Sequence, residues 1–177
     1  PRYRPGGVPL VVPGDITVAQ AENFAGSTFG DWTGDAPPPA RTSDRPARST
    51  RAVHIVSKPD APQSELGIGN VFLPRKHPDY YCAVVMNAVL GGLFSSRINL
   101  NLREVHGYTY GAFSYLEWRR QAGPLVVSTA VQSDVTAPAA TEVLKEIDRM
   151  RAEPISADEL SLATSYLAGV FPIRYET

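Results

Sequence analysis

The alternation of apolar and polar residues over 108–118 is the clearest structural pattern in the chain. A strand presents every second side chain on the same face, and the apolar segment 124–132 follows after a turn at 119–123. The pattern therefore predicts an antiparallel hairpin over 108–132. The residues expected on one face of its first strand are Tyr108, Tyr110, Ala112, Ser114, Leu116 and Trp118.

Three further segments have the composition of strands. Residues 8–12, Val-Pro-Leu-Val-Val, predict a buried strand. Residues 52–60 and 64–75 are rich in β-branched and apolar side chains and predict two more strands.

Helical spacing of apolar residues predicts five helices, at about 16–29, 79–90, 95–106, 137–151 and 157–170. Two pairs have the spacing of a capping box: Thr17 with Gln20, and Ser156 with Glu159. The first helix is expected to stop at Gly30, and the last ahead of Pro172. The side chains expected to point inward are Ile98, Leu102 and Val105 on the third helix, and Ala140, Val143, Leu144, Ile147 and Met150 on the fourth.

Blocks of strands and blocks of helices predict an α+β fold, a mostly antiparallel sheet with helices on one face. The division expected is a strand–helix unit at 1–30, a Pro/Arg-rich linker at 31–51 and a main domain at 52–177. A single strand and helix cannot bury a core of their own. The sheet that completes the first unit must therefore lie elsewhere.

Composition narrows the classes of function. A chain of 177 residues with a net charge of −1 argues against a polyanion-binding protein, and the arginines of the linker have no interleaved aromatic residues. We therefore expect no nucleic-acid partner. The lone Cys82 excludes an internal disulfide and a thiolate zinc cluster. The longest apolar stretches are expected to be too short to span a bilayer. We therefore expect a soluble protein, located either in the cytoplasm or in the periplasm. A start without methionine indicates a fragment or a processed chain.

The run GGLFSSRINLNLREVHGYTYG (91–111) holds the candidate functional residues. Gly91 and Gly92 precede a short amphipathic helix, which ends in Leu-Arg-Glu and stops at Gly107. The strand that follows places Tyr110 seven positions after Arg103. Spacing alone leaves a structural interpretation open, in which Arg103 pairs with a neighbouring carboxylate and Tyr110 packs in the core.

This run resembles the signature of the second half of the M16 zinc metallopeptidases, of the pitrilysin and mitochondrial processing peptidase type. The opening stretch 10–32 is similar to the last strand and helix of that family's first half. The closing stretch 155–177 resembles its ELxxAKxxL…PLxxET helix, with Thr164 in place of the usual lysine. The resemblance covers nearly the whole chain. It implies a truncated LuxS/processing-peptidase-like metallohydrolase fold.

The resemblance also implies roles for the motif residues. Tyr110 would donate a hydrogen bond to the oxyanion that forms when a peptide carbonyl is attacked, and Arg103 would hold neighbouring backbone carbonyls of the substrate. Gly91 and Gly92 would let the substrate backbone pass closely, although a break between helices explains them equally well. Tyr108 is the alternative to Tyr110, because both are expected on one strand face.

The family's zinc-binding motif, HxxEH, does not occur in this sequence. The three histidines, His54, His77 and His106, have no ligand spacing on one helix. We therefore expect no zinc in this chain and no proteolysis by it alone. Zinc would come from an HxxEH-bearing half of the same protein or of a partner subunit. The partners implied are that half and peptide substrates, and a homo-oligomer is left open.

A catalytically silent structural or partner subunit is the main alternative, because some members of the family have lost the chemistry. An unrelated α+β binding module is the third. An intact arginine–tyrosine pair favours the supporting role in peptide hydrolysis, since a scaffold has no need of it.

Overall fold

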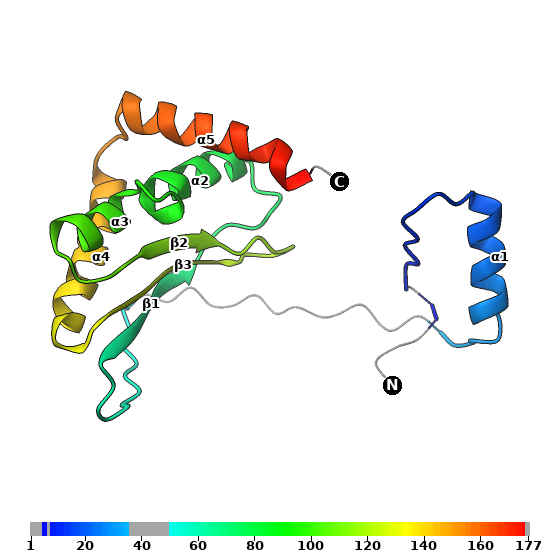
Figure 1. The fold of residues 1–177 in the computed structure, drawn as a ribbon, viewed down its shortest axis with the longest axis horizontal. Coiled ribbons are helices and arrows are strands. Elements are labelled where there is room, and N and C mark those ends of the chain that lie inside the picture. Colours follow the sequence, from blue (N-terminus) through cyan, green and yellow to red (C-terminus); the bar gives the residue numbers. More distant parts are fainter. Residues whose placement is uncertain (1–4, 7, 36–49, 176–177) are drawn as a thin grey trace. The chain divides into compact units, whose positions relative to one another are not determined.

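The computed structural model describes residues 5–6, 8–35 and 50–175, and the chain divides into two units, Pro1–Arg48 and Ser49–Thr177 (Figure 1). Most of the predicted linker, residues 36–49, lies outside the described residues. Each unit is considered by itself.

Among its described residues, 5–6 and 8–35, the first unit contains one helix, α1 (Val18–Phe29). Its predicted capping box is confirmed: the Thr17 hydroxyl accepts from the Gln20 N–H at 3.3 Å, and the Gln20 side chain accepts from the Thr17 N–H at 2.9 Å. The helix ends at Gly30, as predicted.

The predicted buried strand at 8–12 is wrong, because these residues are exposed and form no ladder. A strand needs a hydrogen-bonded neighbour, and the described part of the first unit offers none.

The second unit is built on a three-stranded antiparallel sheet in the order β1-β3-β2. The strands are β1 (Gln63–Val71), β2 (Ala112–Leu116) and β3 (Pro124–Gln132). The predicted hairpin is confirmed, with Ala112 opposite Thr129 and Leu116 opposite Leu125. The strand predicted at 52–60 is wrong, because Val53, Ile55 and Val56 are exposed and unpaired.

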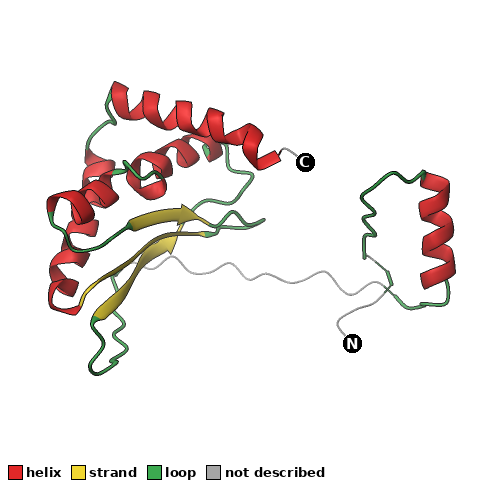
Figure 2. Ribbon diagram, viewed as in Figure 1, coloured by secondary structure: helices red, strands yellow, loops and turns green. Residues whose placement is uncertain are grey.

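Helices cover one face of this sheet (Figure 2). Ala112, Val127 and Val131 point into the covered face and are buried, whereas Phe113 and Tyr115 lie on the other face and are about half exposed. The α+β layer prediction is confirmed.

In chain order the helical elements of the second unit are α2 (Tyr80–Asn87), the π-helical turn η1 (Ala88–Gly92), α3 (Arg97–Asn99), the π-helical segment η2 (Leu100–Val105), the 3₁₀ turn η3 (Ser133–Val135), α4 (Thr136–Ala152) and α5 (Ala157–Tyr175).

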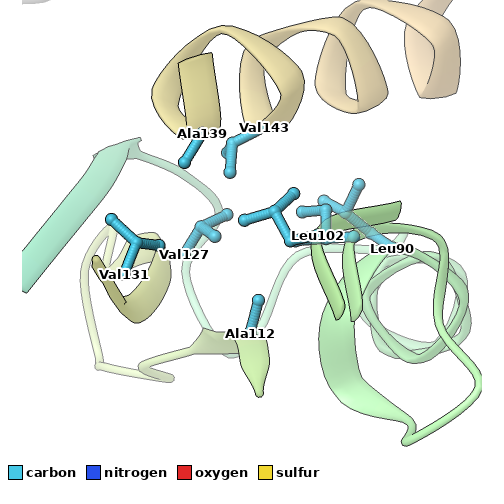
Figure 3. Close-up of a cluster of buried hydrophobic side chains, with 8 residues drawn as sticks. Leu90, Leu102, Ala112, Val127, Val131, Ala139 and Val143 are labelled. Atoms are coloured by element: carbon cyan, nitrogen blue, oxygen red, sulfur yellow. The ribbon is translucent and has the colours of Figure 1, made fainter. Parts of the chain in front are cut away.

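The core lies between the sheet and the helical layer. Its buried members are Leu90, Ile98, Leu102, Ala112, Val127, Val131, Ala139 and Val143, most of them drawn in Figure 3. Ile98 and Leu102 are buried as predicted, but Val105 is 74% exposed. The reason is that η2 is π-helical: its wider turn rotates Val105 away from the stripe that a regular α-helix would keep.

Two predictions about the last two helices need correction. On α4 the buried small residue is Ala139, while the predicted Ala140 is only partly buried. The helix α5 was expected to stop ahead of Pro172, yet it continues through that residue. The Ser156–Glu159 capping box at its start is confirmed, since each side chain accepts from the other residue's backbone N–H.

The run Tyr80–Val105 has the length and apolar composition that a membrane-spanning helix would need, with a mean hydropathy of 1.3. The sequence-based statement that no stretch is long enough is therefore too strong. Half of its most apolar 18-residue stretch is buried inside the fold, and residues 93–96 interrupt the helix. Leu90, Ile98 and Leu102 in the run belong to the core, which is the arrangement of a core helix.

Candidate functional site

The two glycines of the motif have different surroundings. Both close the π-helical turn η1, and the Leu93 N–H donates to the Ala88 carbonyl at 3.2 Å. Gly91 is buried against β2, where an added Cβ would lie 2.5 Å from the Ser114 Oγ. Gly92 is exposed, and a Cβ added there would lie 3.0 Å from atoms of Asn87. Gly91 is therefore needed for close packing on the strand, and only Gly92 is open to a ligand.

Asn99 joins the loop after the glycines to the start of β2. Its side-chain amide donates to the Phe94 carbonyl at 2.6 Å and accepts from the Ala112 N–H at 3.0 Å. Asn99 is 1% exposed and Ala112 is fully buried, so the Ala112 N–H depends on this side chain for its hydrogen bond. A second hydrogen bond ties β2 to the end of α2: the Ser114 hydroxyl donates to the Asn87 side-chain oxygen at 2.8 Å.

Arg103 lies on η2 and is about one-third exposed. Its guanidinium carbon is 4.5 Å from the centroid of the Phe94 ring, and its Nε lies 3.5 Å from a Glu104 carboxylate oxygen. An exposed pair of this kind contributes little to stability and does not fix the side chain. The Phe94 ring supports one face of the guanidinium, which leaves its N–H edge available for hydrogen bonds.

Gly107 ends this helix in a left-handed conformation, with φ of +64°. Its N–H donates to the Arg103 carbonyl at 3.2 Å, and the next N–H, of Tyr108, donates to the Leu102 carbonyl at 2.8 Å. The prediction that Gly107 turns the helix sharply into the following segment is confirmed. The Tyr108 ring stacks on His106, with centroids 4.9 Å apart, and packs against the core.

Tyr110 is 92% exposed and precedes β2, so it is not part of the strand. Its backbone is nevertheless held in place on both sides. The Thr109 hydroxyl donates to the Ala130 carbonyl at 2.6 Å, and the Thr129 hydroxyl donates to the Gly111 carbonyl at 3.0 Å. The predicted alternation fails at this point, since Tyr108 and Tyr110 do not share a strand face. Core packing does not explain Tyr110, whereas it does explain Tyr108.

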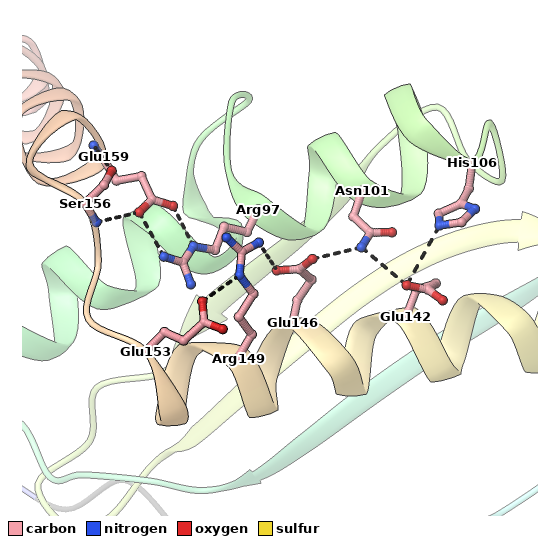
Figure 4. A network of polar contacts seen from close by, with 9 residues as sticks. All are labelled: Arg97, Asn101, His106, Glu142, Glu146, Arg149, Glu153, Ser156 and Glu159. Atoms are coloured by element: carbon pink, nitrogen blue, oxygen red, sulfur yellow. Dashed lines mark hydrogen bonds and ion pairs between the residues drawn. The ribbon is translucent and has the colours of Figure 1, made fainter.

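A network of polar side chains supports the same helix from the side of α4 and α5 (Figure 4). Arg97 is 7% exposed at its side chain and makes a two-pronged pair with Glu159, at 2.5 and 2.8 Å. The hydrogen bond from Arg97 is the main cause that lowers the pKa of Glu159 to about 2. Farther along, Asn101 donates to Glu146 at 2.8 Å and to Glu142 at 3.4 Å. The helix that carries Arg103 is thus tied to the C-terminal helices.

The described residues hold no group of three or more His, Cys, Asp or Glu side chains that would bind a metal ion. His54 lies in an extended exposed segment, His77 in a turn and His106 at the end of η2. The donor set of a zinc site therefore does not fit this part of the molecule. What it does present is a phenol and a guanidinium, both of which can donate hydrogen bonds.

The sequence did not reveal three features of this site. Asn99 resembles any polar residue in a helix, and only the fold shows its two backbone partners. The partner of Arg97 lies 62 residues away along the chain, so no local spacing indicates it. Phe94 was expected only as part of the motif, and its contact with Arg103 depends on how the loop folds.

Comparison with known proteins gives a consistent picture. The profile of the family "Peptidase M16 inactive domain" matches residues 2–167. The uncharacterized zinc protease YmxG of Bacillus subtilis (strain 168) is 21% identical over 168 residues, which is 93% of this chain and 41% of that protein.

Solved structures show the same fold. A peptidase M16 inactive domain from Pseudomonas fluorescens matches with a TM-score of 0.70 and 24% identity, over 88% of this chain and 37% of that one. A protease from Helicobacter pylori matches with a TM-score of 0.76 and 16% identity, over 89% of this chain and 39% of that one. The chain spans about two-fifths of the length of these relatives.

Proposed function

This chain belongs to the peptidase M16 family and matches its inactive domain, and from that premise we propose that it is the non-zinc, substrate-binding half of an M16-type endopeptidase. In this proposal Arg103 and Tyr110 support peptide-bond hydrolysis that is initiated on another half. The zinc ion and the water that it activates belong to an HxxEH-bearing half, either in the same protein or in a partner subunit.

The observation that carries the proposal is the exposure of Tyr110 on a fixed backbone. A phenol that is 92% exposed adds little to the stability of the fold. The hydrogen bonds of Thr109 and Thr129 nevertheless hold its neighbours in place. A backbone that is already held limits the positions that the Tyr110 hydroxyl can reach, which supports a role in stabilising an oxyanion.

The proposed role of Arg103 is different. Its Nε faces Glu104, but its two terminal nitrogens have no hydrogen-bond partner within the described residues, and backbone carbonyls of a bound peptide would accept from them. These contacts already exist before the reaction, so they stabilise the bound substrate and the transition state alike. Gly92, which is exposed, is the one of the two glycines that would let the peptide backbone pass.

Peptide cleavage by the full-length protein carrying Arg103→Ala tests this assignment. KM should rise while kcat changes less, because uniform binding is lost. Glu104→Gln is the matched control, since it removes the neighbouring ion pair and leaves the guanidinium in place. Unchanged kinetics for Arg103→Ala would favour the alternative, a catalytically silent structural or partner subunit.

A further inference from the structure

One end of the sheet continues as two segments that lie side by side. The Phe72 N–H donates to the Gly123 carbonyl at 2.7 Å, and the Arg75 N–H donates to the Arg119 carbonyl at 2.9 Å. The segment after β1 is therefore bonded to the turn between β2 and β3. This contact places the backbone of Arg75 beside that of Arg119, and Lys76 and Arg120 are their neighbours along the chain.

Aromatic rings line the same end. The Arg75 guanidinium carbon lies 3.6 Å from the centroid of the Tyr80 ring, and Tyr80 in turn packs on Trp118 with centroids 4.3 Å apart. Tyr81 lies edge-on to Tyr80 and is 76% exposed. The stacking holds the guanidinium flat and leaves its N–H edge free. We call this group the basic–aromatic end; its members are Arg75, Lys76, Tyr80, Tyr81, Trp118, Arg119 and Arg120.

The charges of this end are not balanced locally. Arg119 pairs with Glu117, and Asp79 lies 3.7 Å from His77. Within the described ranges of the chain, Arg75, Lys76 and Arg120 have no carboxylate partner. By contrast, Arg97 pairs with Glu159, and Arg149 pairs with both Glu146 and Glu153. Three unpaired cations beside exposed aromatic surface indicate an anionic, partly apolar ligand.

We propose that the basic–aromatic end binds an acidic peptide segment, whose carboxylates accept from Arg75 and Arg120 while its chain lies on the rings of Tyr81 and Trp118. Planar guanidinium groups match carboxylates in two-pronged geometry, and aromatic faces accept peptide backbone or apolar side chains. A peptide fits better than a nucleic acid, because the cations occupy only the end of the sheet and the chain's net charge is −1. The proposal does not depend on the function proposed for Arg103 and Tyr110.

Fluorescence anisotropy on the full-length protein tests this, with a chelator present so that zinc-dependent cleavage does not interfere. The probe is a fluorescein-labelled peptide with a run of Glu and Asp, compared with its Gln and Asn counterpart. We expect only the acidic peptide to bind, more weakly as salt is added.

The double variant Arg75→Gln and Arg120→Gln should bind it about tenfold more weakly, the loss expected for charge-assisted hydrogen bonds. Arg75→Lys should also weaken binding, because an ammonium group does not stack as a guanidinium does.

Lys58→Gln is the matched control, since Lys58 is also without an ion pair in the described residues but lies outside the basic–aromatic end. Equal binding of the neutral peptide would overturn the proposal, and so would an equal loss from Lys58→Gln. A single-stranded oligonucleotide that bound more tightly, and lost binding in the same double variant, would show a nucleic-acid surface instead. Thermal unfolding of each variant should match that of the parent, which separates loss of binding from loss of fold.

Discussion

The side-chain oxygen of Asn99 accepts a hydrogen bond from the Ala112 N–H at 3.0 Å, and the same side chain donates to the Phe94 carbonyl at 2.6 Å. One buried amide thus joins three parts of the candidate site: the loop after the glycines, the helix of Arg103 and the strand that follows Tyr110. The backbone segments that carry the arginine and the tyrosine are therefore joined by a common polar link.

Replacing Asn99 by alanine should therefore destabilise the protein. The change leaves the buried Ala112 N–H without a partner, which costs about 1–3 kcal/mol, and it also removes the part-buried bond to the Phe94 carbonyl. Urea unfolding of the full-length protein measures the difference. Ser95→Ala, an exposed change in the same loop, should stay within about 0.5 kcal/mol. Equal stabilities for the two variants would show that the Asn99 link is dispensable.

Gly91→Ala should also be destabilising. The new methyl group would lie 2.5 Å from the Ser114 Oγ and 2.6 Å from the Ser114 backbone nitrogen, so η1 and β2 would have to move apart. Overpacking of this kind costs about 1–3 kcal/mol. Gly169→Ala is the control, because nothing lies within 4 Å of its added Cβ and alanine favours a helix. A neutral Gly91→Ala would contradict the close packing that we describe.

The pair of Arg97 and Glu159 predicts a dependence of stability on pH. The Arg97 hydrogen bond lowers the folded-state pKa of Glu159 from 4.5 to about 2. A depressed carboxylate pKa stabilises the fold above the unfolded-state value, and this contribution is lost as the pH falls from 4.5 toward 2. The unfolding temperature should fall across that window, and Glu159→Gln should remove this part of the fall.

Glu159→Gln should also lower stability at neutral pH, since Arg97 would stay buried without its counter-charge. Breaking such a pair costs about 3–5 kcal/mol. Asp158→Asn removes a carboxylate from the same first turn of α5 and serves as the control. If both variants unfold alike at neutral pH and on acidification, the pair is not the source of the effect.

Local patterns predicted part of this fold and non-local contacts decided the rest. The hairpin followed from alternation within one segment, and the capping boxes from spacings of three residues. The strands expected at 8–12 and 52–60 did not form, because a strand depends on a neighbour that its own sequence does not specify. The π-helical geometry of η2 likewise turns Val105 toward solvent, and no residue pattern in that segment predicts a π-helix.

The candidate site shows the same division. The motif identified Arg103 and Tyr110, and the conformation of Gly107 agrees with the sharp turn predicted there. Whether Tyr108 or Tyr110 is the free phenol could not be read from alternation, because the strand begins only at Ala112. Packing separates the two tyrosines, since Tyr108 stacks on His106 and Tyr110 is exposed.

We propose that Tyr110 stabilises the transition state of a peptide-bond hydrolysis that is initiated on a zinc-bearing half. Steady-state cleavage of a peptide by full-length Tyr110→Phe, beside Tyr108→Phe, tests it most directly. Removing one exposed hydroxyl should leave unfolding within about 0.5 kcal/mol of the parent. For Tyr110→Phe, kcat should fall on the order of a hundredfold, the loss typical of one oxyanion donor, while Tyr108→Phe keeps most of its turnover. Full turnover by Tyr110→Phe, with or without a loss in Tyr108→Phe, would contradict the claim.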